Sequence, residues 1–200
     1  MKTGNIYFLK PSGRARAALP IALFALAACL LTAGAGWELR AGQQAPAQTF
    51  KLETTAFTPG GDIPTRYTCQ GADVSPALTW TDPPAGTKSF VLIADDPDAP
   101  IGTFVHWVVY DLPATAQRLP EAIAGNDEMG RGGRQGMNDF RMSGYAGPCP
   151  PPGKYHRYFF RLYAVDKVLN LKGGATRREV DRAMQGHVLA QAEVMGRFRR

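Results

Sequence analysis

The stretch SFVLIADDPDAPIGTFVHWVVY, residues 89–110, is the part of the sequence that decides the fold class. Its two apolar runs, residues 89–94 and 106–110, are short and rich in β-branched and aromatic side chains, as buried strands are. The run YFFRLYAV at residues 158–165 has the same character. Shorter strands are expected at residues 50–52 and 78–80. With the Pro- and Gly-rich loops between them, these runs predict a mostly β domain.

One helix is predicted near the end of the chain. Thr176 and Glu179 form a capping box just after the helix-breaking Gly173 and Gly174. A stripe at helical spacing follows and predicts a C-terminal helix that packs against a sheet. The stripe consists of Val180, Ala183, Met184, His187, Gln191, Val194 and Phe198. On this stripe His187 is expected to be a hydrogen-bonded structural residue, and the glycine-rich residues 121–137 are expected to form a mobile loop.

Length and composition fit one domain with many turns, over residues 48–200. Of the 200 residues, 22 are Gly and 16 are Pro, a high share that argues against a helical bundle. The chain is 44% hydrophobic and 20% charged, which excludes a disordered or collagen-like protein. The net charge of +6 comes largely from four basic residues before residue 17, and the remaining charges nearly balance. No nucleic-acid partner is therefore expected.

Residues 1–47 are predicted to be a targeting segment and spacer. A basic stretch to Arg16 precedes an apolar, uncharged run at residues 17–36, as in a secretory signal. The sequence LAAC ending at Cys29 is typical of a lipoprotein signal and would make Cys29 a lipidated N-terminus. Small-residue cleavage sites at residues 33–35 and 45–47 are the alternative route, and an uncleaved anchor is the third. We expect export to the periplasm or cell envelope, with membrane contact only through the signal or a lipid anchor.

Export changes the interpretation of the other two cysteines. Cys69 and Cys149 are then the thiols of the mature domain, in an oxidising compartment. A disulfide between them is the favoured prediction, since neither has another partner in the domain. The alternative is that Cys149, flanked by prolines, is a nucleophile.

Two loops after predicted strands carry the polar groups from which a site could be built. The first contains Asp96 and Asp98 and leads to His106, and the second, residues 144–153, leads to His156 and Tyr158. The aspartates could form a simple polar turn. Together, however, the groups predict an anion or phosphate site, because a protonated histidine beside a carboxylate is a good phosphate donor.

Other chemistries fit the sequence less well. Zinc could take His106, His156 and Asp96, but the sequence has no close-spaced ligand pair such as HxxxH or CxxC, so no metal is expected. The GxSxG motif of serine hydrolases is absent. Asp96 and Asp98 as a glycosidase pair are two residues apart on one turn, and a shared solvated loop is favoured for them.

The sequences DPDAP, HWVV and GYAGPCPPPGKYHRYFFRLYAVD together resemble the phosphatidylethanolamine-binding proteins, in particular their bacterial and archaeal Raf-kinase-inhibitor-like branch. The segments IPTRYTCQGADVSPALTW and GHVLAQAEVMGRF extend the resemblance from about Phe50 to Arg200. It implies a mostly antiparallel two-sheet β-sandwich with a small anion pocket at one end. The residues that it places in the pocket are Asp96, Asp98, His106, Tyr145, Gly147, His156 and Tyr158.

The function expected from this sequence is that of an exported, non-enzymatic binding protein without a cofactor. Its pocket is expected to hold phosphate or a phosphorylated head group, with Asp96 orienting a histidine and with Tyr158 and the Gly147 amide donating to the ligand. A protein-binding inhibitor of a protease or kinase is the alternative. A hydrolase is a third hypothesis, disfavoured because the sequence indicates no nucleophile for it.

Overall fold

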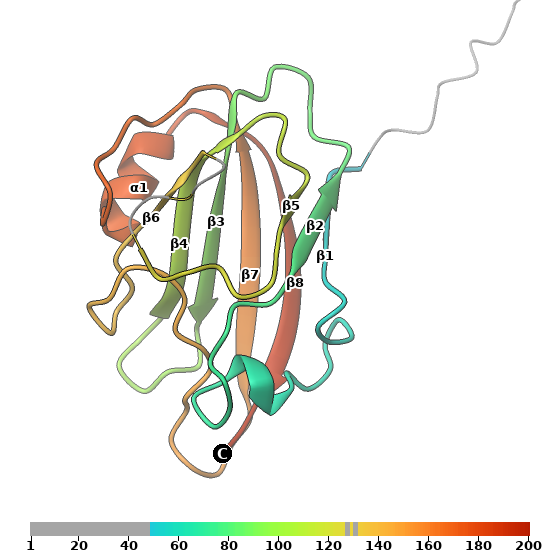
Figure 1. Cartoon of the computed structure of the whole chain (residues 1–200), viewed down its shortest axis with the longest axis vertical. Helices are drawn as coiled ribbons and strands as arrows, with labels where there is room; N and C mark the ends of the chain where they lie inside the picture. Colours follow the sequence, from blue (N-terminus) through green and yellow to red (C-terminus); the bar gives the residue numbers. More distant parts are fainter. Residues whose placement is uncertain (1–48, 127–128, 130–131) are drawn as a thin grey trace, which may run out of the picture. The chain divides into compact units, whose positions relative to one another are not determined.

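The computed structural model describes residues 49–126, 129 and 132–200; the predicted targeting segment and Cys29 lie outside them. The described chain folds into two antiparallel sheets, a short 3-10 helix η1 (Thr65–Tyr67) and the α-helix α1 (Arg177–Met184). The smaller sheet has the order β1 (Lys51–Glu53), β2 (Leu78–Thr81), β5 (Arg118–Leu119). The larger sheet has the order β6 (Arg134–Gln135), β4 (Phe104–Pro113), β3 (Ser89–Asp96), β7 (His156–Val165), β8 (Val188–Phe198). Figure 1 shows the smaller sheet beside the larger one.

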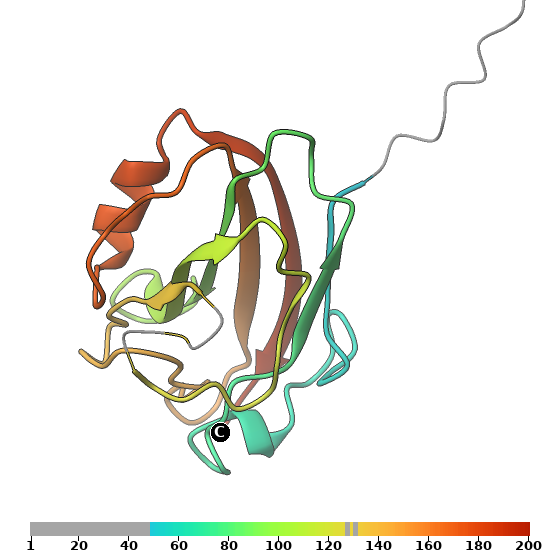
Figure 2. The same cartoon turned by 45° about the horizontal axis from the view of Figure 1, so that its top comes forward.

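The larger sheet is covered on both faces, which explains why its central strands are almost wholly apolar. Successive side chains of a strand point to opposite faces. Phe90, Leu92 and Ala94 of β3 accordingly join the core between the sheets. Val91 and Ile93 point the other way, into a second core closed by α1, which Figure 2 shows on the far side of the larger sheet from the small one. Both apolar runs of the opening stretch are therefore buried strands, as predicted, and the two-sheet antiparallel fold is confirmed.

The predicted helix begins where the sequence placed it but is shorter. The capping box is present: the Thr176 N–H donates to Glu179 Oε2 at 2.8 Å, and the Glu179 N–H donates to Thr176 Oγ1 at 3.4 Å. The helix ends at Met184, and Gly186 takes the left-handed conformation with φ +77°. The prediction that the helix continues to Phe198 is wrong, because Val188–Phe198 form strand β8, which pairs with β7.

Side-chain burial in β8 explains the error. Ala192, Val194, Gly196 and Phe198 are buried while their immediate neighbours are more exposed, which is a period of two. Some of these positions also fit a period of 3.6, and only pairing with β7 decides between the two. His187 lies in the connection between helix and strand, and its Nδ1 is 2.8 Å from Asp166 Oδ1. It is a hydrogen-bonded histidine, as predicted.

Residues 121–137, predicted as a loop, contain the short strand β6. Gln135 of this strand is completely buried, and its Oε1 accepts from Trp107 Nε1 at 2.8 Å. Its Nε2 donates to the carbonyl oxygens of Ala124 and Asn126, at 2.6 and 2.8 Å. These bonds join residues 9 to 28 positions apart and leave no periodic pattern in the sequence, which is why the strand was not predicted. Within the described part of the chain, no helix is long and apolar enough to cross a membrane.

Candidate functional site

A cavity of about 240 Å³ lies where β3 ends and β4 and β7 begin. Because β3 is antiparallel to both β4 and β7, the end of β3 and the beginnings of β4 and β7 lie together at one end of the larger sheet. The lining residues are Asp96, Ala99, Pro100, Ile101, Phe104, His106, Phe140, Cys149, Pro150, Pro151, His156 and Tyr158. The structure thus brings together four of the seven predicted pocket residues, Asp96, His106, His156 and Tyr158, among mostly apolar neighbours.

Asp96 and His156 form a buried pair in the cavity wall. His156 Nδ1 lies 2.8 Å from Asp96 Oδ2, and the two side chains are 10% and 4% exposed. The other carboxylate oxygen, Oδ1, accepts from the Asp98 backbone N–H at 2.8 Å. The turn across Pro97 therefore fixes the carboxylate, and the carboxylate in turn fixes the imidazole ring of His156.

Asp98 lies next to the cavity but is not part of its lining. Its carboxylate accepts from the backbone N–H of Arg157 and from the guanidinium of the same residue, at 2.7–2.9 Å. The hydrogen bonds from Arg157 lower the pKa of Asp98 to about 2. Asp98 therefore attaches the loop after β3 to the start of β7, which keeps Asp96 and His156 in register.

His106 reaches the cavity through a β-bulge. In the pairing of β3 with β4, Ala94 is opposite Trp107 and Asp95 is opposite Val105, so His106 is the extra residue. A bulge lets two successive side chains lie on the same side of a strand. Trp107 accordingly enters the core between the sheets while His106 faces the cavity at its end, and Val105 joins the other core.

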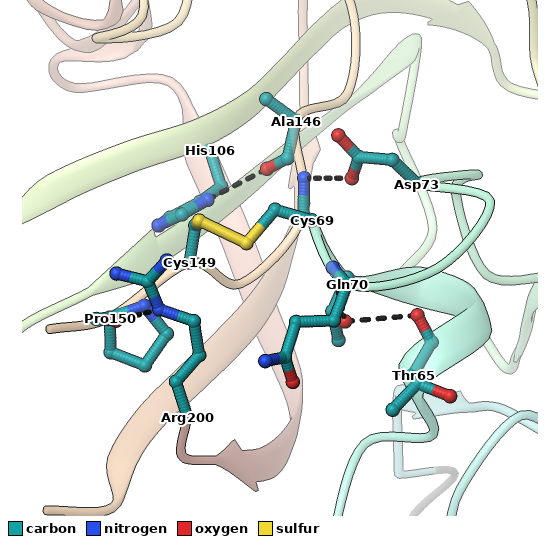
Figure 3. Close-up of a disulfide and its surroundings, with 11 residues drawn as sticks. Thr65, Cys69, Gln70, Asp73, His106, Ala146, Cys149, Pro150 and Arg200 are labelled. Atoms are coloured by element: carbon teal, nitrogen blue, oxygen red, sulfur yellow. Dashed lines mark hydrogen bonds between the residues drawn. A yellow bond between two sulfur atoms is a disulfide. The ribbon is translucent and has the colours of Figure 1, made fainter. Parts of the chain in front are cut away.

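The ring of His106 is fixed by the loop before β7. His106 Nδ1 lies 2.7 Å from the carbonyl oxygen of Ala146, a contact visible in Figure 3. A carbonyl only accepts, so Nδ1 carries the proton and donates it. Burial lowers the pKa of His106 below its ordinary value of 6.5, outweighing the Ala146 hydrogen bond and the Asp96 carboxylate, which raise it. The neutral ring therefore presents an unprotonated Nε2.

Tyr158 supplies the one unsatisfied polar atom of the cavity wall among the residues that the structure describes. Its hydroxyl is buried without a hydrogen-bond partner. The ring packs edge-on against His106, with centroids 5.2 Å apart. Burial, followed by the nearby Asp96 carboxylate, raises the pKa of Tyr158, so the hydroxyl keeps its proton and remains a donor.

Tyr145 and Gly147 do not line the cavity. The Tyr145 hydroxyl donates to the Tyr67 carbonyl oxygen at 2.7 Å, and the Gly147 N–H donates to Asp73 Oδ1 at 2.7 Å. Both groups hold the loop before β7 against the loop after η1. The expectation that the Gly147 amide would donate to a ligand therefore has no support in this geometry. Asp73, which the sequence analysis did not select, is the residue that engages this amide.

The same two loops are joined covalently. Cys69 and Cys149 form a disulfide with a Cα–Cα distance of 5.5 Å, as predicted, and Figure 3 shows it beside His106 and Ala146. The Cys69 N–H also donates to the Pro148 carbonyl oxygen at 3.2 Å. The carbonyl that orients His106 is thus carried by a loop held by a disulfide and by several hydrogen bonds.

A larger open cleft of about 540 Å³ lies beside the cavity and shares His156 with it. Of its three cations, Arg157 and Arg197 are paired with Asp98 and Asp62, and the third is Lys154. We take the smaller cavity as the candidate site, because it contains the buried pair and the unsatisfied hydroxyl. Within the described residues no group of three or more His, Cys, Asp or Glu side chains has the arrangement of a metal site.

The comparisons with known proteins agree with this fold. A family model described as phosphatidylethanolamine-binding protein matches residues 53–199. A UPF0098 protein of Aquifex aeolicus is 52% identical over 147 residues, covering 72% of this chain and 85% of the relative. A UPF0098 protein of Methanothermobacter thermautotrophicus is 48% identical, covering 74% and 98%.

Two solved structures are also similar to this chain. CT736 of Chlamydia trachomatis, described as a homologue of phosphatidylethanolamine-binding protein, is 39% identical with a TM-score of 0.70, covering 76% of this chain and 99% of that chain. YbcL of Escherichia coli, described as a new member of the mammalian family, is 32% identical with a TM-score of 0.69, covering 76% and 98%. The chain belongs to the phosphatidylethanolamine-binding protein family.

Proposed function

We propose that this protein is an exported, non-enzymatic binding protein whose cavity holds a small anion, phosphate or a phosphorylated head group. The observation that carries the proposal is the buried Asp96–His156 pair next to the unpartnered hydroxyl of Tyr158. A buried donor without a partner costs about 1–3 kcal/mol. An anionic oxygen in the cavity would remove this cost.

The surroundings of the cavity favour a small ligand held by few hydrogen bonds. Pro100, Phe104, Phe140 and Pro151 form apolar walls, and the volume is about 240 Å³. Hydrogen bonds are stronger where water is excluded and the effective dielectric constant is low. A ligand oxygen next to Tyr158 and the histidines would benefit from this environment.

Two observations support export. The basic and apolar segments before residue 37 have the order of a secretory signal. The mature domain contains the Cys69–Cys149 disulfide, and structural disulfides persist mainly in oxidising compartments. Lipidation of Cys29 is one route by which the protein would stay at the membrane, and soluble release into the periplasm is the other. Intact-mass analysis of protein isolated from its cell envelope distinguishes them.

The non-enzymatic part of the proposal rests on the state of Cys149. Cys149 is the one cysteine among the described residues that line the cavity, and its sulfur is bonded to Cys69 instead of being a free thiol. A thiolate is needed for attack on a substrate. Turnover of a phosphoester or ester that disappears in His156→Ala would contradict this part of the proposal.

Recognition of a protein at the mouth of the cavity is the second candidate function. Ile101 on the loop between β3 and β4 is 86% exposed, and Phe140 is 43% exposed. Both residues also line the cavity. Replacement of Ile101 by Ser should abolish binding of such a partner, and a partner that binds the variant as tightly as the wild type would exclude this second function.

Calorimetric titration with phosphate tests the anion site, with two histidine variants as a matched pair. His156 and His187 each lie 2.8 Å from an aspartate, but His156 lines the cavity and His187 does not. His156→Ala should weaken binding about 10- to 150-fold, as expected for loss of a charge-assisted hydrogen bond. His187→Ala should bind like the wild type. Equal affinities in all three proteins would place the site elsewhere.

The affinity should also depend on pH in one direction. A bound anion favours the protonated form of a histidine, so binding should tighten as the pH falls and weaken as it rises past the pKa of the group. Because burial lowers the pKa of His106 below 6.5 in the ligand-free protein, the tightening of binding through this residue should continue to below that pH. Affinity that is constant between about pH 5 and 8 would exclude the histidines from the site.

A further inference from the structure

The disulfide joins two loops at a point where one cysteine is exposed and the other belongs to the cavity wall. Cys69, in the loop after η1, is exposed to solvent. Cys149, in the loop before β7, is only partly exposed and lines the cavity. Figure 3 shows the bond between these loops, next to His106. A thiol in solution therefore has readier access to Cys69 than to Cys149.

The wall segment PCPPP, residues 148–152, has few backbone bonds of its own. Its cysteine is the one residue of the five with a backbone N–H, because proline has none. The Pro148 carbonyl oxygen accepts from the Cys69 N–H at 3.2 Å, and the Pro150 carbonyl oxygen accepts from Arg200 Nε at 2.7 Å. Two contacts of the wall segment, the disulfide and the first of these hydrogen bonds, thus lead to Cys69.

Other contacts near the cavity do not depend on the disulfide. Ala146 is bonded to His106 twice, through its carbonyl oxygen to Nδ1 at 2.7 Å and through its N–H to the His106 carbonyl oxygen at 3.0 Å. The Gly147 N–H donates to Asp73. The ladders of β3 with β4 and β7 lie outside both loops. Opening the S–S bond therefore releases the wall segment while the sheet and His106 are still held.

We infer that this disulfide is a reversible modification site, opened by a dithiol protein that attacks the Cys69 sulfur, and that its reduction loosens the cavity wall. Attack at Cys69 follows from its exposure, because thiol–disulfide exchange depends on access to the attacked sulfur. The inference rests on the proposed function, since it names a control of ligand binding at the same cavity.

The exchange proceeds in two steps. A thiolate of the reductant bonds to the Cys69 sulfur, and the electron pair of the S–S bond leaves with the Cys149 sulfur, which takes a proton from water. The second thiolate of the reductant then attacks the reductant's own sulfur in the mixed disulfide and releases Cys69, which is protonated in the same way. The protein disulfide gains two electrons, and the dithiol is oxidised to a disulfide.

Reduction should weaken ligand binding without unfolding the domain. The wall segment contributes Cys149, Pro150 and Pro151 to the cavity lining. When it is released, water enters, and hydrogen bonds to the ligand become weaker because the local dielectric constant rises. We expect the affinity for phosphate to fall about five- to 30-fold.

The order of attack is tested on the native oxidised protein with glutathione, a monothiol that stops at the mixed disulfide. After alkylation of free thiols, peptide mass spectrometry should find glutathione on Cys69 and the alkyl group on Cys149. Glutathione mainly on Cys149, or no exchange in the native protein, overturns the inference. This measurement does not depend on any ligand.

Calorimetric titration with phosphate compares the oxidised protein with protein reduced by dithiothreitol. The double variant Cys69→Ser, Cys149→Ser is the control, and it should bind like the reduced protein and not respond to dithiothreitol. Equal affinities of the oxidised and reduced proteins overturn the inference and leave the proposed function standing. Absence of phosphate binding to the oxidised protein overturns the proposed function.

Hydrogen exchange distinguishes local release from general unfolding. Reduction should speed amide exchange in peptides covering residues 144–157 and leave that of α1 and β8 unchanged. Equal loss of protection in α1 and β8 would mean that the disulfide holds the whole fold, which overturns the inference. Unchanged exchange in residues 144–157 overturns it as well, because the wall segment would then be held without the disulfide.

Discussion

Gly147 lies where the loop before β7 crosses the loop after η1, and the lack of a side chain allows this crossing. A Cβ atom there would lie 2.2 Å from the Tyr67 carbonyl oxygen and 2.5 Å from Asp73 Oδ1. Neither atom is the end of a freely moving side chain. Gly147→Ala should therefore destabilise the protein by about 2 kcal/mol in urea denaturation. It should also weaken anion binding, because the adjacent Ala146 holds His106.

Gly186→Ala is the control for this variant. Gly186 has φ +77°, and a Cβ atom there would meet no atom within 4 Å. The substitution should cost only the left-handed conformation, about 1–2 kcal/mol, and leave the anion affinity unchanged. Unchanged stability and affinity in Gly147→Ala would show that neither the fold nor the site needs the close crossing of these two loops.

At the scale of residues, the sequence could indicate which side chains gather but not all of their roles. Asp96 follows one predicted strand, His156 precedes another and Tyr158 begins it, and the motif resemblance selected all three. Tyr145 and Gly147 were selected in the same way, yet they bond to Tyr67 and Asp73. These partners are more than 70 residues away in the sequence. No local pattern could have identified them.

Among the elements, α1 is attached to the larger sheet by a buried ionic contact. Asp95 at the end of β3 is 2% exposed and accepts from Arg161 of β7 and from Arg177 of α1, the latter at 3.0 Å. Removal of one partner leaves a buried carboxylate less well compensated. Arg177→Ala should therefore lower the free energy of unfolding by about 1–3 kcal/mol.

Arg178→Ala is the matched control, one residue further along the same helix and exposed. Its effect on stability should be within about 0.5 kcal/mol. If the two variants are equally stable in urea denaturation, the contact of Arg177 with Asp95 does not hold the helix.

The elements also show where periodicity fails as a guide. The start of α1 was predictable because Thr176 and Glu179 form a local motif. Its end was not, because Val194 and Phe198 fit both a helical stripe and a strand. Ten residue pairs between β7 and β8 decide the matter. Strand pairing is a long-range interaction, and an apolar pattern alone does not contain it.

For the whole molecule, the disulfide is expected to contribute a large part of the stability. Cys69 and Cys149 are separated by 80 residues. Closing a loop of this length contributes about 4.5 kcal/mol in the chain-entropy model. The double variant Cys69→Ser, Cys149→Ser should lose up to this amount in urea denaturation, and wild-type protein kept reduced should behave in the same way. Two reactive thiols in denatured, unreduced protein would contradict the pairing.

The overall architecture could be predicted from the sequence to a large extent. The apolar runs indicated the central strands, and the motif resemblance supplied the second sheet and its antiparallel arrangement. The short strands β5 and β6 were missed, since two residues carry no periodic signal. These strands are held by tertiary hydrogen bonds such as that between Gln135 and Trp107.

The bulge at His106 has a consequence for anyone who engineers this protein. Deleting one residue from β4 near this position would remove one of the two irregularities in its ladder with β3, and regular ladders are what stability-directed design favours. The same deletion would turn the imidazole away from the cavity, because every side chain beyond the change moves to the opposite face. Variants selected only for a higher melting temperature would thus tend to repair the irregularity and lose the site. Screening for heat resistance should be coupled to a binding assay.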